Sequence, residues 1–259
     1  MTTPFITDHH HDFFKAACAN VKTTKQAFEL LHLRINQLIT QKPLINNQEL
    51  DPSILKEIQL LTRLAIPVYT AYTEAIFLKL IYTPNGFTKT EIDQILKVQK
   101  KQSIIEAWKI AIQTSAKKSI GKNSGFYPNS LKKINTLINQ HLQEPSELRN
   151  KIAHGQWHTT FNKYNSSLTP DTSAKIRDID IVKISKWVDI FNIMGELFFL
   201  SNQSPLKGYS EQYWNKITDI EELLNKRSNW SFEQKIKNMH KKKNYYKIYN
   251  STVTNTSST

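Results

Sequence analysis

Three polar residues in one short stretch, Arg149, Asn150 and His154, carry side chains that together can do acid–base chemistry on an anionic substrate. An imidazole gains and loses a proton near neutral pH, so His154 can act as a general acid or a general base. A guanidinium stays charged and forks onto phosphate oxygens, so Arg149 can hold a phosphate group. The amide of Asn150 can hold the imidazole or contact the phosphate.

The stretch that carries these side chains has the start and stop signals of a short helix. Pro145 and Ser146 supply the start, with Ser146 as the N-cap, and Glu147 places an acidic side chain in the first turn. Gly155 is typical of a helix end. We therefore expect a helix of only about two turns.

The spacing inside this helix separates an apolar face from a polar face. Leu148 and Ile152 are four residues apart and share one face, which we expect to pack on the core. Asn150 and His154 are also four apart and share a nearly opposite face, with Arg149 beside them. A polar group of this kind, directed away from its own core, needs water, a ligand or a second subunit.

The sequence Arg-Asn-Lys-Ile-Ala-His from Arg149 to His154 resembles the signature of HEPN domains. That signature is an arginine, four to six residues and a histidine, often with Asn or Asp directly after the arginine. The resemblance covers about residues 50 to 200 and implies an all-α, HEPN-like antiparallel helical bundle. Members of the family are commonly metal-independent endoribonucleases of bacterial toxins, phage-defence systems and RNA-processing factors.

The resemblance also implies a mechanism and an assembly. Two copies of the motif meet across a homodimer interface, so that two copies of His154 can divide the acid and base roles, with Arg149 and Asn150 as the other catalytic residues. The RNA 2′-hydroxyl attacks the adjacent phosphorus, which leaves a 2′,3′-cyclic phosphate and a 5′-hydroxyl. An antitoxin or another regulatory protein is an expected partner. One toxin subgroup has a tyrosine two residues after the histidine, where this chain has Gln156, so we do not expect regulation by modification of that tyrosine.

Two other interpretations remain open at this point. The chain can be a non-catalytic, HEPN-like dimerising module that binds RNA or protein without cutting. In a purely structural interpretation, Arg149 pairs with a carboxylate such as Glu147, and His154 caps the helix C-terminus, where a cation is favoured. A non-catalytic module has no chemical need for His154, which favours the enzyme.

The overall charge of the chain favours a polyanionic partner such as RNA. The chain has 259 residues, with 35 Lys and Arg against 22 Asp and Glu, which gives a formal net charge of +13. Each phosphate that a basic side chain neutralises releases counterions, which strengthens binding at low salt. One candidate RNA contact is the basic, glycine-containing loop just before the motif region, with Lys117, Lys118 and Lys122.

A second candidate RNA contact is the basic region near the C-terminus. Lys241, Lys242 and Lys243 lie close in sequence to Trp230 and to two tyrosines. Interleaved cations and aromatic rings suit contacts to the RNA backbone combined with stacking on unpaired bases. The alternative for both clusters is an ordinary solvated surface.

Apolar residues recur every three or four positions along most of the chain, which predicts an all-α fold. Besides the motif helix, the predicted helices span residues 12–40, 52–82, 88–116, 129–142, 184–198, 210–226 and 231–243. After the motif we expect a small β-hairpin made by residues 156–161 and 174–180. The long first helix should pack on the bundle or, as the alternative, on a second protomer.

The same patterns suggest a domain division and a location. We expect an N-terminal helical region over residues 1–50, the HEPN-like domain over 51–200, a basic helical extension over 201–245 and a disordered tail over 246–259. The chain shows neither a signal-peptide pattern nor a long uninterrupted apolar segment, which predicts a cytoplasmic protein without a membrane anchor. A single cysteine, Cys18, excludes cysteine-based zinc sites, and we expect neither a metal nor a cofactor.

Overall fold

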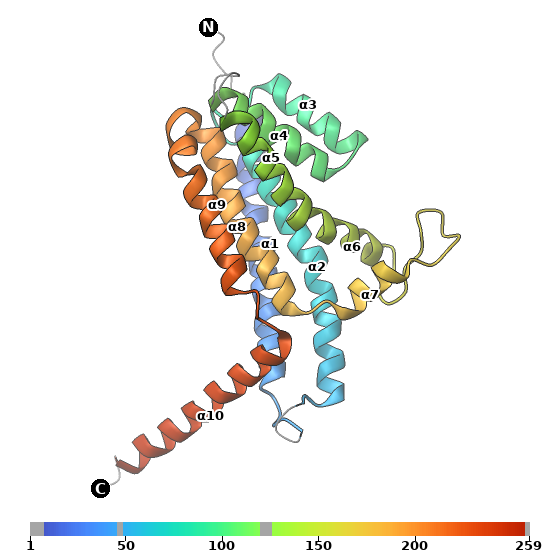
Figure 1. Ribbon diagram of the computed structural model, residues 1–259, viewed down its shortest axis with the longest axis vertical. Helices are drawn as coiled ribbons and strands as arrows, with labels where there is room; N and C mark the ends of the chain where they lie inside the picture. The colour runs from blue at the N-terminus through green and yellow to red at the C-terminus, as the bar shows by residue number, and fades with distance from the viewer. Residues whose placement is uncertain (1–7, 46–48, 120–125, 257–259) are drawn as a thin grey trace.

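The computed structural model describes residues 8–45, 49–119 and 126–256, and this part of the chain is all-α (Figure 1). In chain order, the elements are α1 (Asp8–Ile39), α2 (Pro52–Ile81), α3 (Lys89–Lys101), α4 (Ile104–Ser119), α5 (Phe126–Ile138), η1 (Asn139–Gln143), α6 (Glu144–Ala153), α7 (Pro170–Asp178), α8 (Ile181–Gln203), η2 (Pro205–Tyr209), α9 (Ser210–Lys226) and α10 (Phe232–Thr256). Here α denotes an α-helix and η a π-helical segment. The predicted all-α class is confirmed, whereas the HEPN-like arrangement of the bundle stays a prediction.

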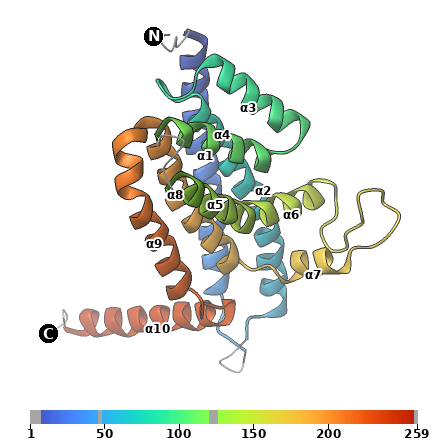
Figure 2. The same ribbon diagram turned by 45° about the horizontal axis from the view of Figure 1, so that its top comes forward.

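The long helices α1 and α2 form an antiparallel pair, on which α8 and then α9 are laid (Figures 1 and 2). The predicted long N-terminal helix is confirmed, and it packs extensively on α2 of its own chain. The centre of the bundle is aromatic: the ring centroids of Trp108 and Phe191 are 5.8 Å apart, and those of Tyr69 and Phe191 are 6.2 Å apart. These contacts join α2, α4 and α8, and edge-to-face rings add specific geometry to the burial of apolar area.

Helix α2 starts where the sequence signals place it, at Pro52 after the N-cap Asp51. The carboxylate of Asp51 accepts a hydrogen bond from the backbone N–H of Ser53 at 2.9 Å. Hydrogen bonds from Ser53 and Lys42 hold the pKa of Asp51 well below its usual value. By length and composition α2 could cross a membrane, but most of its apolar window is buried inside this fold.

The predicted helix over residues 88–116 is wrong, because two helices occupy this range. Helix α3 ends at Lys101, and α4 begins at Ile104 and turns back to pack against α3 (Figure 1). The hydroxyl of Ser103 accepts a hydrogen bond from the backbone N–H of Glu106 at 3.1 Å, which caps the start of α4. Residues 97–103 lack an apolar stripe, so a continuous helix would bury little apolar area here, and the break between α3 and α4 costs little.

The predicted start of the short motif helix at Ser146 is also wrong. Helix α5 continues through the π-helical segment η1 into α6, so one helical segment runs from Phe126 to Ala153. Gln143, the residue before α6, is itself helical, and no side chain caps it. Pro145 is tolerated in the first turn of α6 because the π-helical geometry of η1 precedes it.

The predicted β-hairpin does not form in the part of the chain that the structure describes. Residues Pro170–Asp178 form helix α7, so most of the second expected strand, residues 174–180, is helical. Thr169 occupies the N-cap position and Pro170 the first helical position, where proline favours a helix start. The only pairing in this region is an isolated antiparallel bridge between Phe161 and Leu168.

The C-terminal helices match the predicted order. Helix α9 has the predicted bounds, and α10 extends to Thr256, so it takes in most of the segment that composition assigned to a disordered tail. His240 donates a hydrogen bond to the backbone carbonyl of Ile39 at 2.7 Å, and Lys243 donates one to that of Thr40. These bonds satisfy carbonyl groups at the end of α1 and hold α10 against it.

Buried apolar side chains form one cluster that runs from Ile35 in α1 to Ile236 in α10. The predicted domain boundaries near residues 50 and 200 therefore do not separate two hydrophobic cores among the described residues. The division into an N-terminal region, a central domain and a C-terminal extension stays a prediction.

Candidate functional site

The end of α6 fixes where the motif histidine lies. His154 is the C-cap, and Gly155 follows with a positive φ of 77°. The backbone N–H of Gly155 donates to the carbonyl of Ile152 at 3.0 Å, and that of Gln156 donates to the carbonyl of Lys151 at 2.9 Å. This pair of bonds is a Schellman motif, which glycine favours because it has no side chain to clash at positive φ. The predicted helix stop at Gly155 is confirmed.

The two faces of α6 are arranged as the spacing predicts. Leu148 and Ile152 are buried, whereas Asn150 and His154 are exposed. The motif thus contributes two apolar side chains to the core and directs an amide and an imidazole away from it.

The side chain of Arg149 does not lie on the face of α6 that carries Asn150 and His154. Its guanidinium forms an ion pair with the carboxylate of Glu74 in α2, and both side chains are about one third exposed. Five positions along a helix separate Arg149 from His154, which places their side chains roughly 140° apart around the axis. A guanidinium has five N–H donors, so the pair with Glu74 leaves Arg149 able to bind a second anion. Glu147, considered from the sequence as its partner, instead accepts a hydrogen bond from Gln143.

Asn150 and His154 line an open groove of about 960 Å³ between α6 and the loop that follows it. Lys151 and Lys163 line the same groove and add positive charge, while Glu147 is the acidic side chain on its wall. The groove therefore presents an imidazole, an amide and two ammonium groups. The ammonium of Lys151 already donates a hydrogen bond to the backbone carbonyl of Phe161 in the loop, and its two other N–H donors remain for an anion. These groups can bind a phosphate and exchange a proton with it.

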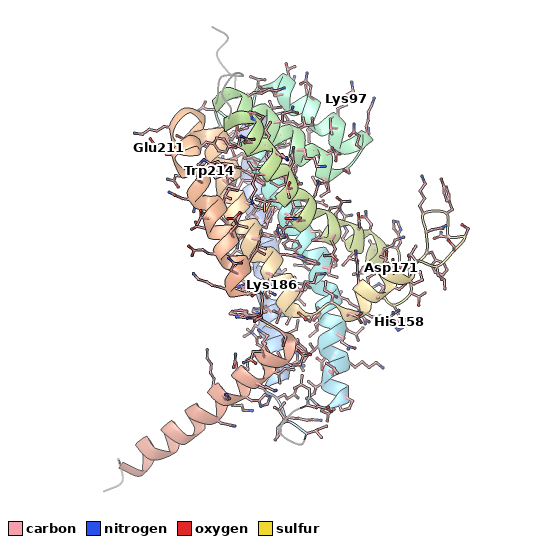
Figure 3. The ribbon with its side chains drawn as sticks, in the orientation of Figure 1. Lys97, His158, Asp171, Lys186, Glu211 and Trp214 are labelled. Carbon is pink, nitrogen blue, oxygen red and sulfur yellow. The ribbon has the colours of Figure 1, made fainter. Side chains whose placement is uncertain are left out.

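The loop over residues 156–169 forms the far wall of the groove, and a buried group of hydroxyls holds its base. The hydroxyl of Thr160 lies 2.6 Å from that of Thr169 and 3.0 Å from that of Ser173. At the loop tip, the side chain of Asn162 accepts hydrogen bonds from the backbone N–H groups of Tyr164 and Ser166 at 3.1 and 3.0 Å. Figure 3 shows this loop projecting from the bundle next to α7, which carries the labelled Asp171.

Apolar side chains are exposed on the same loop. Tyr164 is 75% exposed and Leu168 is 57% exposed, and Phe161, which lines the groove, is 39% exposed. The ammonium of Lys163 lies 5.0 Å from the centroid of the Tyr164 ring. An exposed aromatic ring beside a cation suits stacking on an unpaired base.

Lys117 and Lys118, the described lysines of the first basic cluster, do not line this groove. Lys118 forms an ion pair with Glu91 at 2.7 Å and donates a hydrogen bond to the carbonyl of Gly86 at 2.9 Å. Its ammonium thus already has two partners in its own chain, although the residue is exposed, and RNA binding by Lys118 stays a prediction. Lys117 is exposed, and Lys122 lies outside the described residues. The helical segment from Phe126 to Ala153, about 40 Å long if it were straight, lies between this region of the sequence and His154.

The lysines of the second basic cluster have three different environments. Lys241 is exposed, Lys242 lines a separate cavity, and Lys243 is bound to the carbonyl of Thr40. Both views of the ribbon place α10 on the other side of the bundle from α6 and its loop (Figures 1 and 2). Within one chain, the described lysines of the two clusters are not among the residues that line the groove of His154.

Sequence reasoning missed several groups at this site. Glu74 is 75 residues from Arg149 along the chain, and no local pattern connects the two. Lys151 and Lys163 were not singled out, although Lys151 lies within the motif and Lys163 follows it closely in the sequence. His158, four residues after His154, is exposed on the loop and is not among the residues that line the groove (Figure 3). Among the described residues, no three His, Cys, Asp or Glu side chains gather as they would to bind a metal.

The chain was compared with protein-family models, curated proteins and solved structures, and none of these comparisons finds a match. The function of the groove is therefore inferred from its own residues.

Proposed function

We propose that the protein is a metal-independent endoribonuclease that cleaves RNA at the groove lined by Asn150 and His154. The observation that carries this proposal is the exposure of these two side chains in an open groove that also holds Lys151 and Lys163. His154 transfers the proton, the lysines hold the RNA backbone, and Tyr164 or Phe161 stacks on an unpaired base.

The active form in this proposal is a homodimer. Arg149 and His154 leave α6 in different directions, and Arg149 does not line the groove of its own chain. In a dimer that brings two α6 helices together, Arg149 of one copy can approach the groove of the other. The two histidines then divide the acid and base roles in the attack of the 2′-hydroxyl.

The resemblance of the motif to HEPN domains extends the proposal to a cellular role. We propose that RNA cleavage serves a toxin or antiviral defence system in the cytoplasm and that an antitoxin or regulatory protein restrains it. The exposed apolar side chains Tyr164 and Leu168 offer a surface on which such a protein can dock.

The test is cleavage of end-labelled single-stranded and structured RNAs in EDTA. The wild-type protein should leave 2′,3′-cyclic phosphate and 5′-hydroxyl ends, and His154→Ala should abolish this activity. His158→Ala is the matched control, because it removes an exposed histidine from the loop that follows α6 without changing the lining of the groove. Equal cleavage by wild type and His154→Ala would contradict the proposal.

A second candidate function is a non-catalytic module that binds RNA or protein. The exposed Phe161, Tyr164 and Leu168 favour it, because a binding surface needs such side chains whereas proton transfer does not. If wild type and His154→Ala bind RNA equally and neither cuts, this function replaces the first. In that case Tyr164→Ala should weaken binding, whereas His154→Ala should not.

A further inference from the structure

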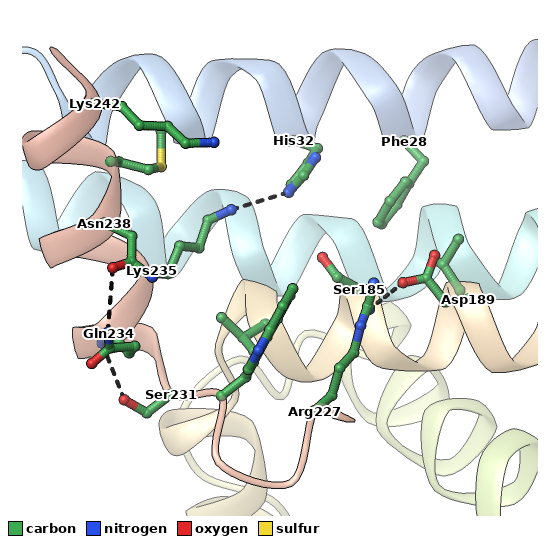
Figure 4. Close-up of a pocket in the computed structure, with 14 residues that line it drawn as sticks. Phe28, His32, Ser185, Asp189, Arg227, Ser231, Gln234, Lys235, Asn238 and Lys242 are labelled. Carbon is green, nitrogen blue, oxygen red and sulfur yellow. Dashed lines mark hydrogen bonds and ion pairs between the residues drawn. The ribbon is translucent and has the colours of Figure 1, made fainter. Parts of the chain in front are cut away.

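A second cavity, of about 440 Å³, lies between α1, α8 and the start of α10. Its volume falls within the range of small-molecule sites, roughly 300 to 1,000 Å³. Figure 4 shows His32 and Phe28 entering from α1, Asp189 from α8 and Lys235 from α10. None of its lining residues lines the groove beside His154.

A half-buried cation in this cavity lacks an acidic partner. The ammonium of Lys235 lies 3.4 Å from Nε2 of His32, and no carboxylate of the described chain forms an ion pair with it (Figure 4). Burial lowers the pKa of Lys235, while the more distant Asp180 acts in the opposite direction. Burial, followed by the charge of Lys235, also lowers the pKa of His32, and Asp189 opposes this shift. A buried cation without a partner is costly, and a bound anion would compensate for it.

The other charges around the cavity leave it positive. Asp189 is already paired with Arg227, whose guanidinium also lies 4.8 Å from the centroid of the Trp230 ring. Lys242 lines the cavity as a further cation, and the described residues include no carboxylate paired with it. Lys235 and Lys242 thus face a cavity whose one acidic side chain is engaged by Arg227.

Aromatic and apolar side chains form the rest of the wall. The rings of Phe28 and His32 are nearly parallel, with centroids 6.2 Å apart and an angle of 13° between their planes. Trp230 is 54% exposed and lines the same cavity, together with Met239. A flat aromatic group can pack on these rings while an anionic group reaches the lysines.

From this combination we propose that the cavity binds a nucleotide, with its base against the aromatic wall and its phosphate between Lys235 and Lys242. A nucleoside monophosphate supplies both features, and it can be a free nucleotide or the phosphorylated end of an RNA strand. The site goes beyond the proposed ribonuclease function and does not depend on it, because it uses neither α6 nor its loop. Bound nucleotide would also hold α10 against α1 and α8.

The test measures binding of the four nucleoside monophosphates by calorimetry, with the matching nucleosides and inorganic phosphate as partial ligands. At least one monophosphate should bind, and Lys235→Met should weaken it tenfold or more, as one lost charge-assisted hydrogen bond implies (about 1.5–3 kcal/mol). Lys237→Met is the matched control, since Lys237 is exposed on the same helix and does not line the cavity. Comparing a short RNA with and without a 5′-phosphate separates a strand end from a free nucleotide.

Each outcome decides the proposal. Lys235→Met removes a half-buried charge, so the thermal midpoint of this variant should not be lower than that of the wild type. A loss of nucleotide binding would then come from the changed site and not from unfolding. His154→Ala should bind the nucleotide as the wild type does, whether or not the ribonuclease proposal holds. Absence of binding by all four monophosphates up to about 1 mM would overturn the proposal. Equal binding by Lys235→Met and Lys237→Met would also overturn it.

Discussion

The carboxylate of Glu74 in α2 is the ion-pair partner of the motif arginine, Arg149 in α6. The pair connects the helix that carries the candidate catalytic residues to one of the two long helices of the bundle. Because both side chains are about one third exposed, the pair adds little to stability, at most about 1 kcal/mol. Its main effect is to fix where the guanidinium points.

Glu74→Gln should therefore reduce RNA cleavage far more than stability. Without the carboxylate, the guanidinium is no longer held in place, and such misplacement lowers kcat by roughly 10- to 100-fold. Glu57→Gln is the matched control, because Glu57 also lies in α2 and forms an ion pair with Arg34, with an N–O distance of 2.9 Å. Neither residue lines the groove. Single-turnover cleavage and urea unfolding of both variants check this. Equal activity of the two variants would show that Arg149 needs no such positioning.

Acid should destabilise the fold through two partly buried histidines, His32 and His141. Burial lowers the pKa of His141 below its ordinary value of 6.5, and burial and Lys235 do the same for His32. Below pH 6.5 the unfolded chain therefore binds more protons than the folded chain, so stability falls as the pH drops from 6.5 toward the folded pKa values.

The variant His141→Leu should lessen this acid sensitivity, because a side chain that cannot take up a proton replaces the partly buried imidazole. Urea unfolding at pH 7 and pH 5 should show a smaller decrease in the free energy of unfolding for His141→Leu than for the wild type. His158→Ala, at an exposed position, should retain the wild-type decrease. An equal decrease in all three proteins would exclude His141 as a source of the effect.

Gly155→Ala should strain the Schellman motif that ends α6. An added Cβ meets no atom within 4 Å, so the cost comes from the positive φ of 77° and amounts to about 1–2 kcal/mol. Gly195→Ala is the matched control: this helical glycine also has open space around an added Cβ but lacks a positive φ. Thermal unfolding should show a lower midpoint for Gly155→Ala and an unchanged or higher one for Gly195→Ala.

Thr160→Val should loosen the loop that forms the far wall of the groove. The buried hydroxyl of Thr160 accompanies those of Thr169 and Ser173, and its loss leaves them partly unsatisfied, at a cost of about 1–3 kcal/mol. Hydrogen exchange of the amides of residues 161–168 should accelerate. Thr136→Val, which removes an exposed hydroxyl bonded only to the carbonyl of Lys132, should leave exchange in the loop unchanged.

The parts of the fold predicted correctly are those with a strong local pattern. The spacing of apolar residues predicted the bounds of α9 and the buried face of α6, and both agree with the structure. The break between α3 and α4 carried a readable signal, since Ser103 and Glu106 have the spacing of a capping box. The hydrophobic periodicity outweighed that signal and led to one helix in place of two.

Other features could not be predicted from local pattern because they depend on distant residues. The pair between Arg149 and Glu74 and the cavity between His32 and Lys235 join helices far apart in the chain. The predicted start of α6 was wrong for a related reason. Ser146 has the residue type of an N-cap, but the preceding segment η1 is already helical, so α6 needs no cap. The outward direction of Asn150 and His154 was thus predictable from the sequence, whereas the direction of Arg149 was not.

The π-helical segment η1 sets the rotational phase of everything that follows it in the same helix. Such a segment accommodates one extra residue relative to a regular α-helix, and each residue turns the helix by about 100°. Shortening η1 (Asn139–Gln143) by one residue would therefore swing Leu148 and Ile152 off the core and carry His154 with them. The direction in which the motif faces is encoded upstream of the motif, in the length of a five-residue segment that contains none of its residues.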